Sequence, residues 1–410
     1  MRSSSSVGSV AGLWFPSALR RLPILDRVAV GLFLTGLGCV GTGLLPAREA
    51  EVTIRRILPL LLFLGTVIVL AELTAAAEVF DIIAARIAIT ARGSYAALFG
   101  LCVLFASVTT MVLNLDTTAV LLTPVMLALG RKLRIDPTPL AMTTVWLANT
   151  ASLLLPVSNL TNLLAAHRVN LTPLAFAHRM WLPQLAAIAT TMAFLWSWYW
   201  RRGVRDANQL GPLEPHRPGD RHLAAIAFGA CVLFITALLV HVPIGAASSL
   251  SAGIVLVGFL LRGRDTLRPA LVPWRLLVFV TGLFLVVQTI GQHGLDLVVG
   301  SLIGVDDGVS GAFRAAATGA VLSNAANNLP SYVAGEAVIP AGNHTALLAL
   351  LLGTNVGSLG TPWASLATLL WYERCRAANV VVPMRRFLLT GAGLATACSI
   401  VTVAALLVTQ

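Results

Sequence analysis

Apolar stretches separated by short polar segments follow one another along nearly the whole chain, from about residue 27 to residue 408. Most of them have the length that a helix needs to cross a bilayer, about 20 residues. They fall at 27–46, 57–80, 95–130, 138–166, 180–200, 223–242, 247–262, 272–292, 308–340, 344–372 and 387–408. This pattern predicts an all-α polytopic membrane protein.

Two of the windows, 95–130 and 308–340, are too long for one crossing and too polar at their centres for two ordinary ones. A helical hairpin that enters and leaves by the same membrane face accommodates each of them. Because unpaired backbone groups are costly in lipid, the tips of such re-entrant hairpins must face a cavity enclosed by protein. The polar residues near the two tips are Asn114, Asp116, Thr117 and Thr118, and Ser323, Asn324, Asn327, Asn328, Pro330 and Ser331.

The windows 138–166 and 344–372 each contain a polar interruption with a proline. Residues 149–164 read NTASLLLPVSNLTNLL, and residues 355–370, which lie 206 positions later, read NVGSLGTPWASLATLL. Seven of the sixteen aligned positions are identical, including an Asn, a Ser and a Pro. Since proline lacks a backbone donor and obstructs a helix, we predict two broken transmembrane helices. We also expect the two stretches to be neighbours in space.

A further match supports an internal repeat, because residues 63–81 resemble residues 279–296 with one deletion. We therefore expect residues 27–200 and 223–410 to be two transmembrane repeats joined by a linker at 201–222. Each repeat would contain helices, a re-entrant hairpin, a broken helix and a final helix. The helix at 223–242 has no counterpart in the first repeat.

The composition agrees with a membrane protein, and the distribution of charged residues predicts its orientation in the membrane. The chain is 57% hydrophobic and 11% charged, and its mean hydropathy is +0.85. Its 28 Lys and Arg residues fall in short clusters between apolar windows, as in membrane loops and unlike a nucleic-acid-binding patch. Alternating crossings place 22 of the 28 on one side, which we predict to be cytoplasmic.

That orientation makes the two repeats inverted in topology. We expect residues 1–26 to form a cytoplasmic N-terminal tail without a cleaved signal peptide, and the C-terminus to lie outside the plasma membrane. The five cysteines are scattered without metal-ligand or redox spacing, so we expect them to be apolar packing residues.

Inverted repeats with discontinuous helices are typical of secondary transporters, whose site lies where hairpin tips and broken helices converge. Small amides and hydroxyls beside half-helix termini could bind a polar neutral or anionic solute without a basic side chain. The alternative is that these side chains only join helices to one another. The candidate solute-binding residues are Asn114, Thr117, Thr118, Asn149, Thr150, Ser152, Ser158, Asn159, Thr161, Asn162, Ser323, Asn324, Asn327, Asn328, Thr354, Asn355, Ser358, Thr361 and Ser365.

Two acidic residues are candidates for proton coupling. Asp116 lies at the tip of the first hairpin, where a carboxylate in the membrane must titrate, bind a cation or pair; it could instead cap a half-helix. Glu72 lies inside the window 57–80, and the alternative to a coupling role is that its side chain reaches interfacial water near a helix end. A pair between Glu336 and Arg314, on the two arms of the second hairpin, is a further possibility.

Enzyme motifs are absent from the sequence: there is no Walker A motif, no GxSxG and no HExxH. We expect no enzymatic activity, no cofactor and no bound metal.

The hairpin tips and interruptions resemble the arsenical pump membrane protein family, the arsenite/antimonite efflux permeases of the ion transporter superfamily. The resemblance is carried by LNLDTTAVLLTP (113–124), the stretch 149–164, SNAANNLPSYV (323–333) and GTNVGSLGTPWASLATLLW (353–371). It implies export of trivalent arsenic or antimony, driven by proton exchange or by an associated soluble ATPase subunit.

The same superfamily includes sodium- or proton-coupled carriers of citrate and dicarboxylates, so a carboxylate solute is the main alternative. Arsenite is a neutral trihydroxide near pH 7, which suits a pocket of amides and hydroxyls. A non-transporting membrane scaffold is a third hypothesis. A homodimer in the bilayer is compatible with all three.

Overall fold

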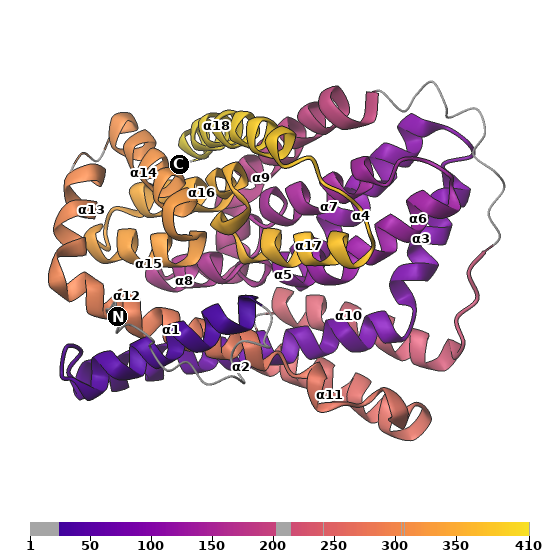
Figure 1. The fold of residues 1–410 in the computed structure, drawn as a ribbon, viewed down its shortest axis with the longest axis horizontal. Helices are drawn as coiled ribbons and strands as arrows, with labels where there is room; N and C mark the ends of the chain where they lie inside the picture. Colours follow the sequence, from indigo (N-terminus) through magenta and orange to yellow (C-terminus); the bar gives the residue numbers. More distant parts are fainter. Residues whose placement is uncertain (1–23, 202–214, 241, 305, 307, 410) are drawn as a thin grey trace, which may run out of the picture.

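A computed structural model describes residues 24–201, 215–240, 242–304, 306 and 308–409 (Figure 1). Over these residues the secondary structure is helical, without a strand. Five of the described helices are long and apolar enough to cross a membrane. The described chain is thus an all-helical polytopic membrane protein.

The helices form two layers, which lie one above the other in Figure 1. In the lower layer α1 packs on α12, α2 on α11 and α12, and α10 on α11. In the upper layer α14 packs on α16, α9 on α18 and α4 on α7. Each layer contains helices from both halves of the chain, so the two predicted repeats are interleaved in space.

The lower layer consists of α1 (Ile24–Gly41), α2 (Ala47–Ala76), α10 (Arg221–Leu239), α11 (Ile244–Arg262) and α12 (Trp274–Ile290). The upper layer consists of α3 (Val79–Thr90), α4 (Tyr95–Leu113), α5 (Leu115–Thr117), α6 (Thr123–Lys132), α7 (Thr138–Thr150), α8 (Leu160–Arg168), α9 (Pro173–Leu195), α13 (Asp296–Ile303), α14 (Val309–Ala326), α15 (Asn328–Val338), α16 (His344–Gly357), α17 (Leu366–Ala377) and α18 (Met384–Val408).

Every predicted apolar window contains a helix, and the main differences lie at helix ends and in short helices. Helix α2 begins at Ala47, ten residues before its window. Hydropathy missed these first turns because they are charged and amphipathic. The short helices α3 and α13 occupy segments that we predicted to be connections. Hydropathy finds crossings, so it misses helices that are too short to cross. The predicted N-terminal tail and most of the linker lie outside the described residues.

Close helix packing depends on glycine, as one position in each layer shows. A Cβ atom at Gly353 of α16 would lie 1.9 Å from the carbonyl oxygen of Ala316 in α14. In the lower layer, a Cβ atom at Gly282 of α12 would lie 2.4 Å from the backbone nitrogen of Phe33 in α1. Small residues let membrane helices approach this closely, which brings their backbones into van der Waals contact.

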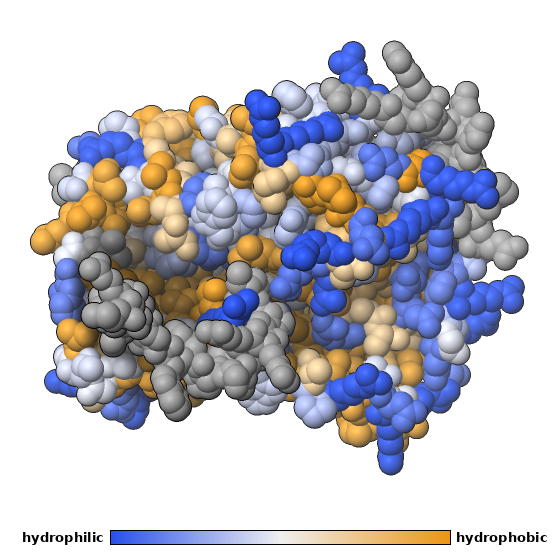
Figure 2. Space-filling model, in the orientation of Figure 1, coloured by the Kyte–Doolittle hydropathy of each residue, from blue (hydrophilic) through white to orange (hydrophobic). Residues whose placement is uncertain are grey.

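The segments rich in Lys and Arg, which contain loops and helix ends together with most of α3, meet at one end of the molecule, here called the basic end: residues 81–94, 131–136, 215–222, 262–275 and 373–386. Arg131 donates to the carbonyl of Ala378, and Arg386 donates to the carbonyl of Trp198. Figure 2 shows hydrophilic side chains gathered toward the right of the view and apolar ones across the middle. At the opposite end, Thr409 donates to the carbonyl of Arg179 at 3.2 Å.

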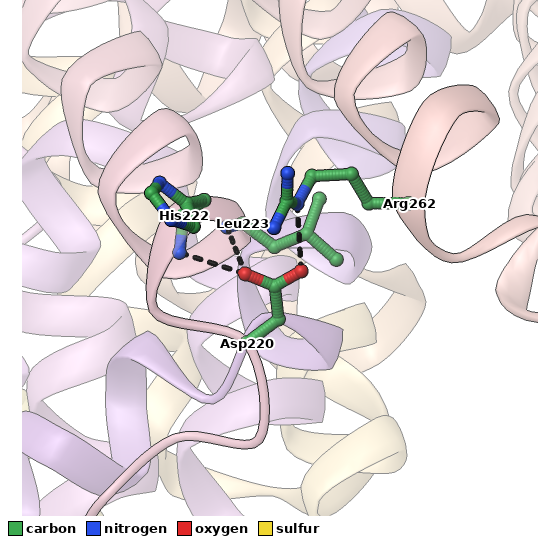
Figure 3. A network of polar contacts seen from close by, with 4 residues as sticks. All are labelled: Asp220, His222, Leu223 and Arg262. Carbon is green, nitrogen blue, oxygen red and sulfur yellow. Dashed lines mark hydrogen bonds and ion pairs between the residues drawn. The ribbon is translucent and has the colours of Figure 1, made fainter.

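Asp220 fastens two lower-layer helices at the basic end (Figure 3). Its carboxylate accepts hydrogen bonds from the backbone N–H groups of His222 (2.8 Å) and Leu223 (3.2 Å), which begin α10. It also accepts from Nε of Arg262, in the last turn of α11, at 2.8 Å. The Arg262 hydrogen bond is the main cause that lowers the pKa of Asp220 below its usual value.

We expect Asp220→Ala to lower the melting temperature of the purified protein at pH 7, and Asp220→Asn to lower it less. Asparagine keeps the helix cap but loses the ion pair with Arg262. A carboxylate with a lowered folded-state pKa stabilises above its unfolded pKa, about 3.9, and the stabilisation is lost as the pH falls through the folded value. The gap between the native protein and Asp220→Asn should therefore shrink below about pH 4. Equal melting temperatures for Asp220→Ala and the control Asp265→Asn, an exposed carboxylate nearby, would contradict this.

Candidate functional site

Two asparagines form the tips of the helical hairpins in the upper layer. Asn114 separates α4 from α5 with φ 108°, and Asn327 separates α14 from α15 with φ 131°. Positive φ is uncommon outside glycine, and asparagine tolerates it better than most residues. In each tip a hydroxyl four residues later, Thr118 or Ser331, donates to the asparagine carbonyl at 2.8 or 2.6 Å. The sequence alone did not show that the two tips are alike, because they share little beyond the asparagine.

The two interrupted helices stop and resume as predicted. Helix α7 ends at Thr150 and α8 begins at Leu160, with Pro156 in the extended and 3-10 segment between them. Helix α16 ends at Gly357 and α17 begins at Leu366, with Pro362 in between. Nearly all residues of α7 and α16 are buried, so these two half-helices form the centre of the upper layer.

Side chains of the two interruptions bond to each other, which confirms that the stretches are neighbours. Thr161 Oγ1 donates to Asn355 Oδ1 at 2.7 Å, and Asn355 Nδ2 donates to Asn162 Oδ1 at 2.9 Å. Asn149 Nδ2 donates to Thr368 Oγ1 at 3.4 Å. Asn149 and Asn355 are aligned in the repeat, and so are Asn162 and Thr368. The contact is therefore reciprocal between the two aligned stretches.

Other amides hold the interruption loops from the side. Asn162 Nδ2 donates to the carbonyls of Ser152 (2.6 Å) and Leu155 (3.0 Å). Gln184 of α9, only 2% exposed, accepts from the N–H groups of Leu153 and Leu154 and donates to the carbonyl of Thr150. Sequence reasoning missed Gln184. The sequence did contain a signal for its role, because Gln184 is an amide within a largely apolar helix, and a buried amide needs hydrogen-bond partners.

A cavity of about 740 Å³ separates the two layers. Its lower wall comes from α1, α2 and α12, and its upper wall from the first hairpin tip, the second tip and α17. Because residues 270–275 and Arg374 also line it, the cavity reaches the basic end. Both predicted coupling acids, Glu72 and Asp116, line this same cavity.

A small cavity of about 30 Å³ lies deeper, between the hairpin tips and the interruptions. Asp116 and Asn327 line both cavities, so the small one continues the large one. Asn159 and Ser365 also line the small cavity, and they are aligned positions of the repeat that directly precede α8 and α17. Two half-helix N-termini, with their partial positive charge, therefore begin at this point.

Three buried polar atoms at these cavities have no hydrogen-bond partner among the described residues: Thr117 Oγ1, Asn159 Nδ2 and Ser365 Oγ. An unsatisfied buried polar atom costs about 1–3 kcal/mol, so such atoms at a cavity call for an occupant. The Asp116 carboxylate is half-buried and has no ion pair or hydrogen bond to any described residue. The site thus offers a hydroxyl pair, an amide donor and an unpaired acid.

The other predicted site residues divide by what they contact. Thr117, Asn159, Asn327, Asn328 and Ser365 line the two cavities. Asn324 and Thr361 line a separate groove between α14 and α18. The remaining ones bond within the upper layer: Asn114, Thr118, Asn149, Thr150, Ser152, Ser158, Thr161, Asn162, Ser323, Thr354, Asn355 and Ser358.

Two expectations need correction. The site is not free of basic side chains, because Arg275 and Arg374 line the large cavity toward the basic end. Glu336 does not pair with Arg314; it lies 2.5 Å from Arg56 of α2, whereas Arg314 pairs with Asp306 at 3.2 Å. The Glu336 partners come from elements far away in sequence, and only the tertiary packing brings them together. No cluster suited to a metal ion occurs among the described residues.

Comparison with known proteins places the chain among membrane carriers. The profile of the family described as "citrate transporter" matches residues 22–343. An arsenical pump membrane protein of Escherichia coli is 30% identical over 315 residues, covering 71% of this chain and 72% of the relative. The chain belongs to the arsenical pump membrane protein family. A relative with the same name from Yersinia enterocolitica is also 30% identical, with the same two coverages.

The relatives and the family profile show that the protein is a secondary transporter of the ion transporter type. Together with the apolar helices they indicate a multi-pass protein of the plasma membrane. As a carrier it lies in the lipid bilayer and moves a small solute. A transport function also fits the absence of enzyme motifs in the sequence.

We expect Asn355→Ala to destabilise the purified protein, because it leaves the buried Thr161 hydroxyl and the side-chain oxygen Oδ1 of Asn162 without partners. Each loss costs about 1–3 kcal/mol. The melting temperature should fall by several degrees. Thr236→Ala is the matched control, since it removes an exposed hydroxyl that bonds only within its own helix, to Val232. Equal melting temperatures for the two variants would show that the crossed contact does not support the fold.

Proposed function

We propose that the protein exports trivalent arsenic or antimony as the neutral trihydroxide, in exchange for protons. The observation that carries this is the site itself, where the unpaired Asp116 carboxylate lies with Thr117, Asn159 and Ser365, whose polar atoms lack partners. The relatives named arsenical pump membrane proteins support the choice of solute.

We further propose that the hairpins with tips at Asn114 and Asn327 are re-entrant, and that residues 27–200 and 223–410 are inverted repeats joined by the linker 201–222. The matching tips and the reciprocal Asn149 and Asn355 contacts support this arrangement. The basic end would be cytoplasmic by the positive-inside rule, so the C-terminus would lie outside. The large cavity would then be open to the cytoplasm, as a carrier loading its export solute requires.

The chemistry of the small cavity suits a hydroxylated solute with few atoms. A volume of about 30 Å³ exceeds the roughly 10–15 Å³ that one water needs, but it is small for a tricarboxylate. A trihydroxide can donate to Asp116 and accept from the Asn159 amide, while the hydroxyls of Thr117 and Ser365 do either. Among the described residues, no cysteine lines either cavity, so arsenic would be carried as the hydroxide.

The coupling ion in this proposal is a proton carried by Asp116. Among the described residues its carboxylate has no ion pair or hydrogen bond, and it lines both cavities. An unpaired carboxylate beside the solute can bind and release a proton between the two faces.

We expect Asp116→Asn to abolish arsenite export, because asparagine cannot carry a proton. Cells without their own efflux system that express this variant should accumulate as much arsenic as cells with an empty vector. Asp116→Glu should keep part of the export, and Asp306→Asn, at a paired carboxylate away from the cavities, should keep all of it. Export by Asp116→Asn at the native rate, with equal protein in the membrane, would refute the proposed role.

Proton-coupled transport of a di- or tricarboxylate is the second candidate. Arg275 and Arg374 line the large cavity, whose volume of about 740 Å³ accommodates citrate, and guanidinium groups bind carboxylates well. The match to the citrate transporter family profile points the same way.

Flux in proteoliposomes separates the two candidates. With an imposed proton gradient we expect uptake or release of arsenite, unchanged by a sodium gradient, and no flux of labelled citrate or succinate. Arg374→Gln should slow carboxylate flux at least tenfold under the second candidate and should leave arsenite flux nearly unchanged under the first. Citrate flux without arsenite flux would replace the first candidate by the second.

A further inference from the structure

An ion pair joins the two layers at the end opposite the basic end. Nη2 of Arg56, in the lower-layer helix α2, lies 2.5 Å from Oε1 of Glu336, in the upper-layer helix α15. Glu336 is only 3% exposed, so its carboxylate is held away from water. The Arg56 side chain is 47% exposed, but removing it would leave the buried Glu336 charge without its nearest cation, which is costly. The contact is therefore a firm one.

The same carboxylate has a second cation within reach in its own layer. Nε of Arg168, at the end of α8, lies 3.9 Å from the Glu336 oxygen that Arg56 contacts. The other oxygen, Oε2, is buried without a hydrogen-bond partner among the described residues. If Arg56 moves away with the lower layer, Arg168 can approach the carboxylate and keep its charge compensated. Glu336 can thus exchange one partner for another.

The ion pair between the layers at the basic end differs in kind. Arg275 of α12 lies 3.8 Å from Glu373 of α17, and both side chains are about 40% exposed. Exposed pairs at this distance contribute little to stability. The Arg275–Glu373 pair lies at the end that the large cavity reaches, and the shorter Arg56–Glu336 pair lies at the opposite end. The carboxylate is thus buried in the pair opposite the basic end and exposed in the pair at the basic end, as expected for a carrier that is open at one end.

We propose that Arg56 and Glu336 form a latch between the layers, and that the carrier must break it, passing Glu336 to Arg168, before its cavity can open at this end. The latch rests on the proposal that the cavity opens alternately to the two faces, and it is independent of the solute. Arg168 would be a positioning residue that lowers the barrier to release. The two arginines should therefore have opposite effects when they are removed.

The test follows which end of the cavity is open, using a cysteine at a cavity-lining position. Leu370→Cys provides it, in a background where the two partly exposed cysteines, Cys39 and Cys231, are replaced by alanine. A charged, membrane-impermeant maleimide is applied to sealed vesicles of either orientation without any solute. The native protein should be labelled mainly from the side of the basic end.

Arg56→Gln should increase labelling from the opposite side at least tenfold and decrease it from the basic end. Arg168→Gln should shift the ratio the other way and slow transport. Arg314→Gln is the matched control, since it breaks an arginine–carboxylate pair at the same end within the upper layer, and it should shift nothing. The latch is refuted if Arg56→Gln leaves the ratio of the two labelling rates equal to that of Arg314→Gln.

A cross-link covers the case in which Arg56→Gln does not fold. With Arg56→Cys and Glu336→Cys joined by a short bis-maleimide, in a chain that keeps Leu370, solute exchange should stop. Exchange at the rate before cross-linking would overturn the proposal. Because the labelling of Leu370→Cys needs no solute, a failure of arsenite flux would leave that result unaffected, and the two proposals can fail separately.

Discussion

The crossed contact between the two interrupted helices is the interaction on which the rest of the structure depends. Asn355 receives a hydrogen bond from Thr161 and gives one to Asn162, and Asn149 reaches Thr368 in return. In a membrane interior no water can satisfy backbone and amide groups, so the interruptions need protein partners, and the crossed contact supplies them for the Asn149 and Asn355 amides. With the contact in place, the N-termini of α8 and α17 begin at one point, beside the hairpin tips. The site exists because two unstable segments stabilise each other.

This requirement explains why so few of the polar residues near the centre face a cavity. Most amides and hydroxyls there bond to loop carbonyls or to the opposite interruption. The atoms that remain without partners, on Thr117, Asn159 and Ser365, are those at the cavities. We therefore propose that the polar residues act in two ways, as the support of the broken segments and as the contact surface for a solute. The acid lies beside them at Asp116, in the first tip only, since the second tip has Leu329 at the corresponding place.

The two layers give the site its relation to the membrane faces. The large cavity lies between them and reaches the basic end, while the Arg56–Glu336 ion pair joins the layers at the opposite end. The family profile and the arsenical pump relatives agree with a carrier built this way. Carriers of one fold transport different solutes, so the solute has to be argued from the cavity itself. Here a small polar pocket favours a small hydroxylated solute, and two arginines at the wider part keep a carboxylate as the rival.

The sequence by itself determined the helices, the interruptions at Pro156 and Pro362, and the pairing of the two stretches that contain them. Hydropathy and proline act locally, and a repeat is visible without coordinates. It also pointed to Asp116 and Glu72 as candidates for proton coupling, because a carboxylate in an apolar window is costly. Only the tertiary structure decided which amides are bound up in the fold, that Gln184 supports a loop, and that Glu336 pairs with Arg56. Those facts depend on which backbone groups end up unpaired and which helices meet across the layers, and neither is encoded at a fixed spacing along the chain.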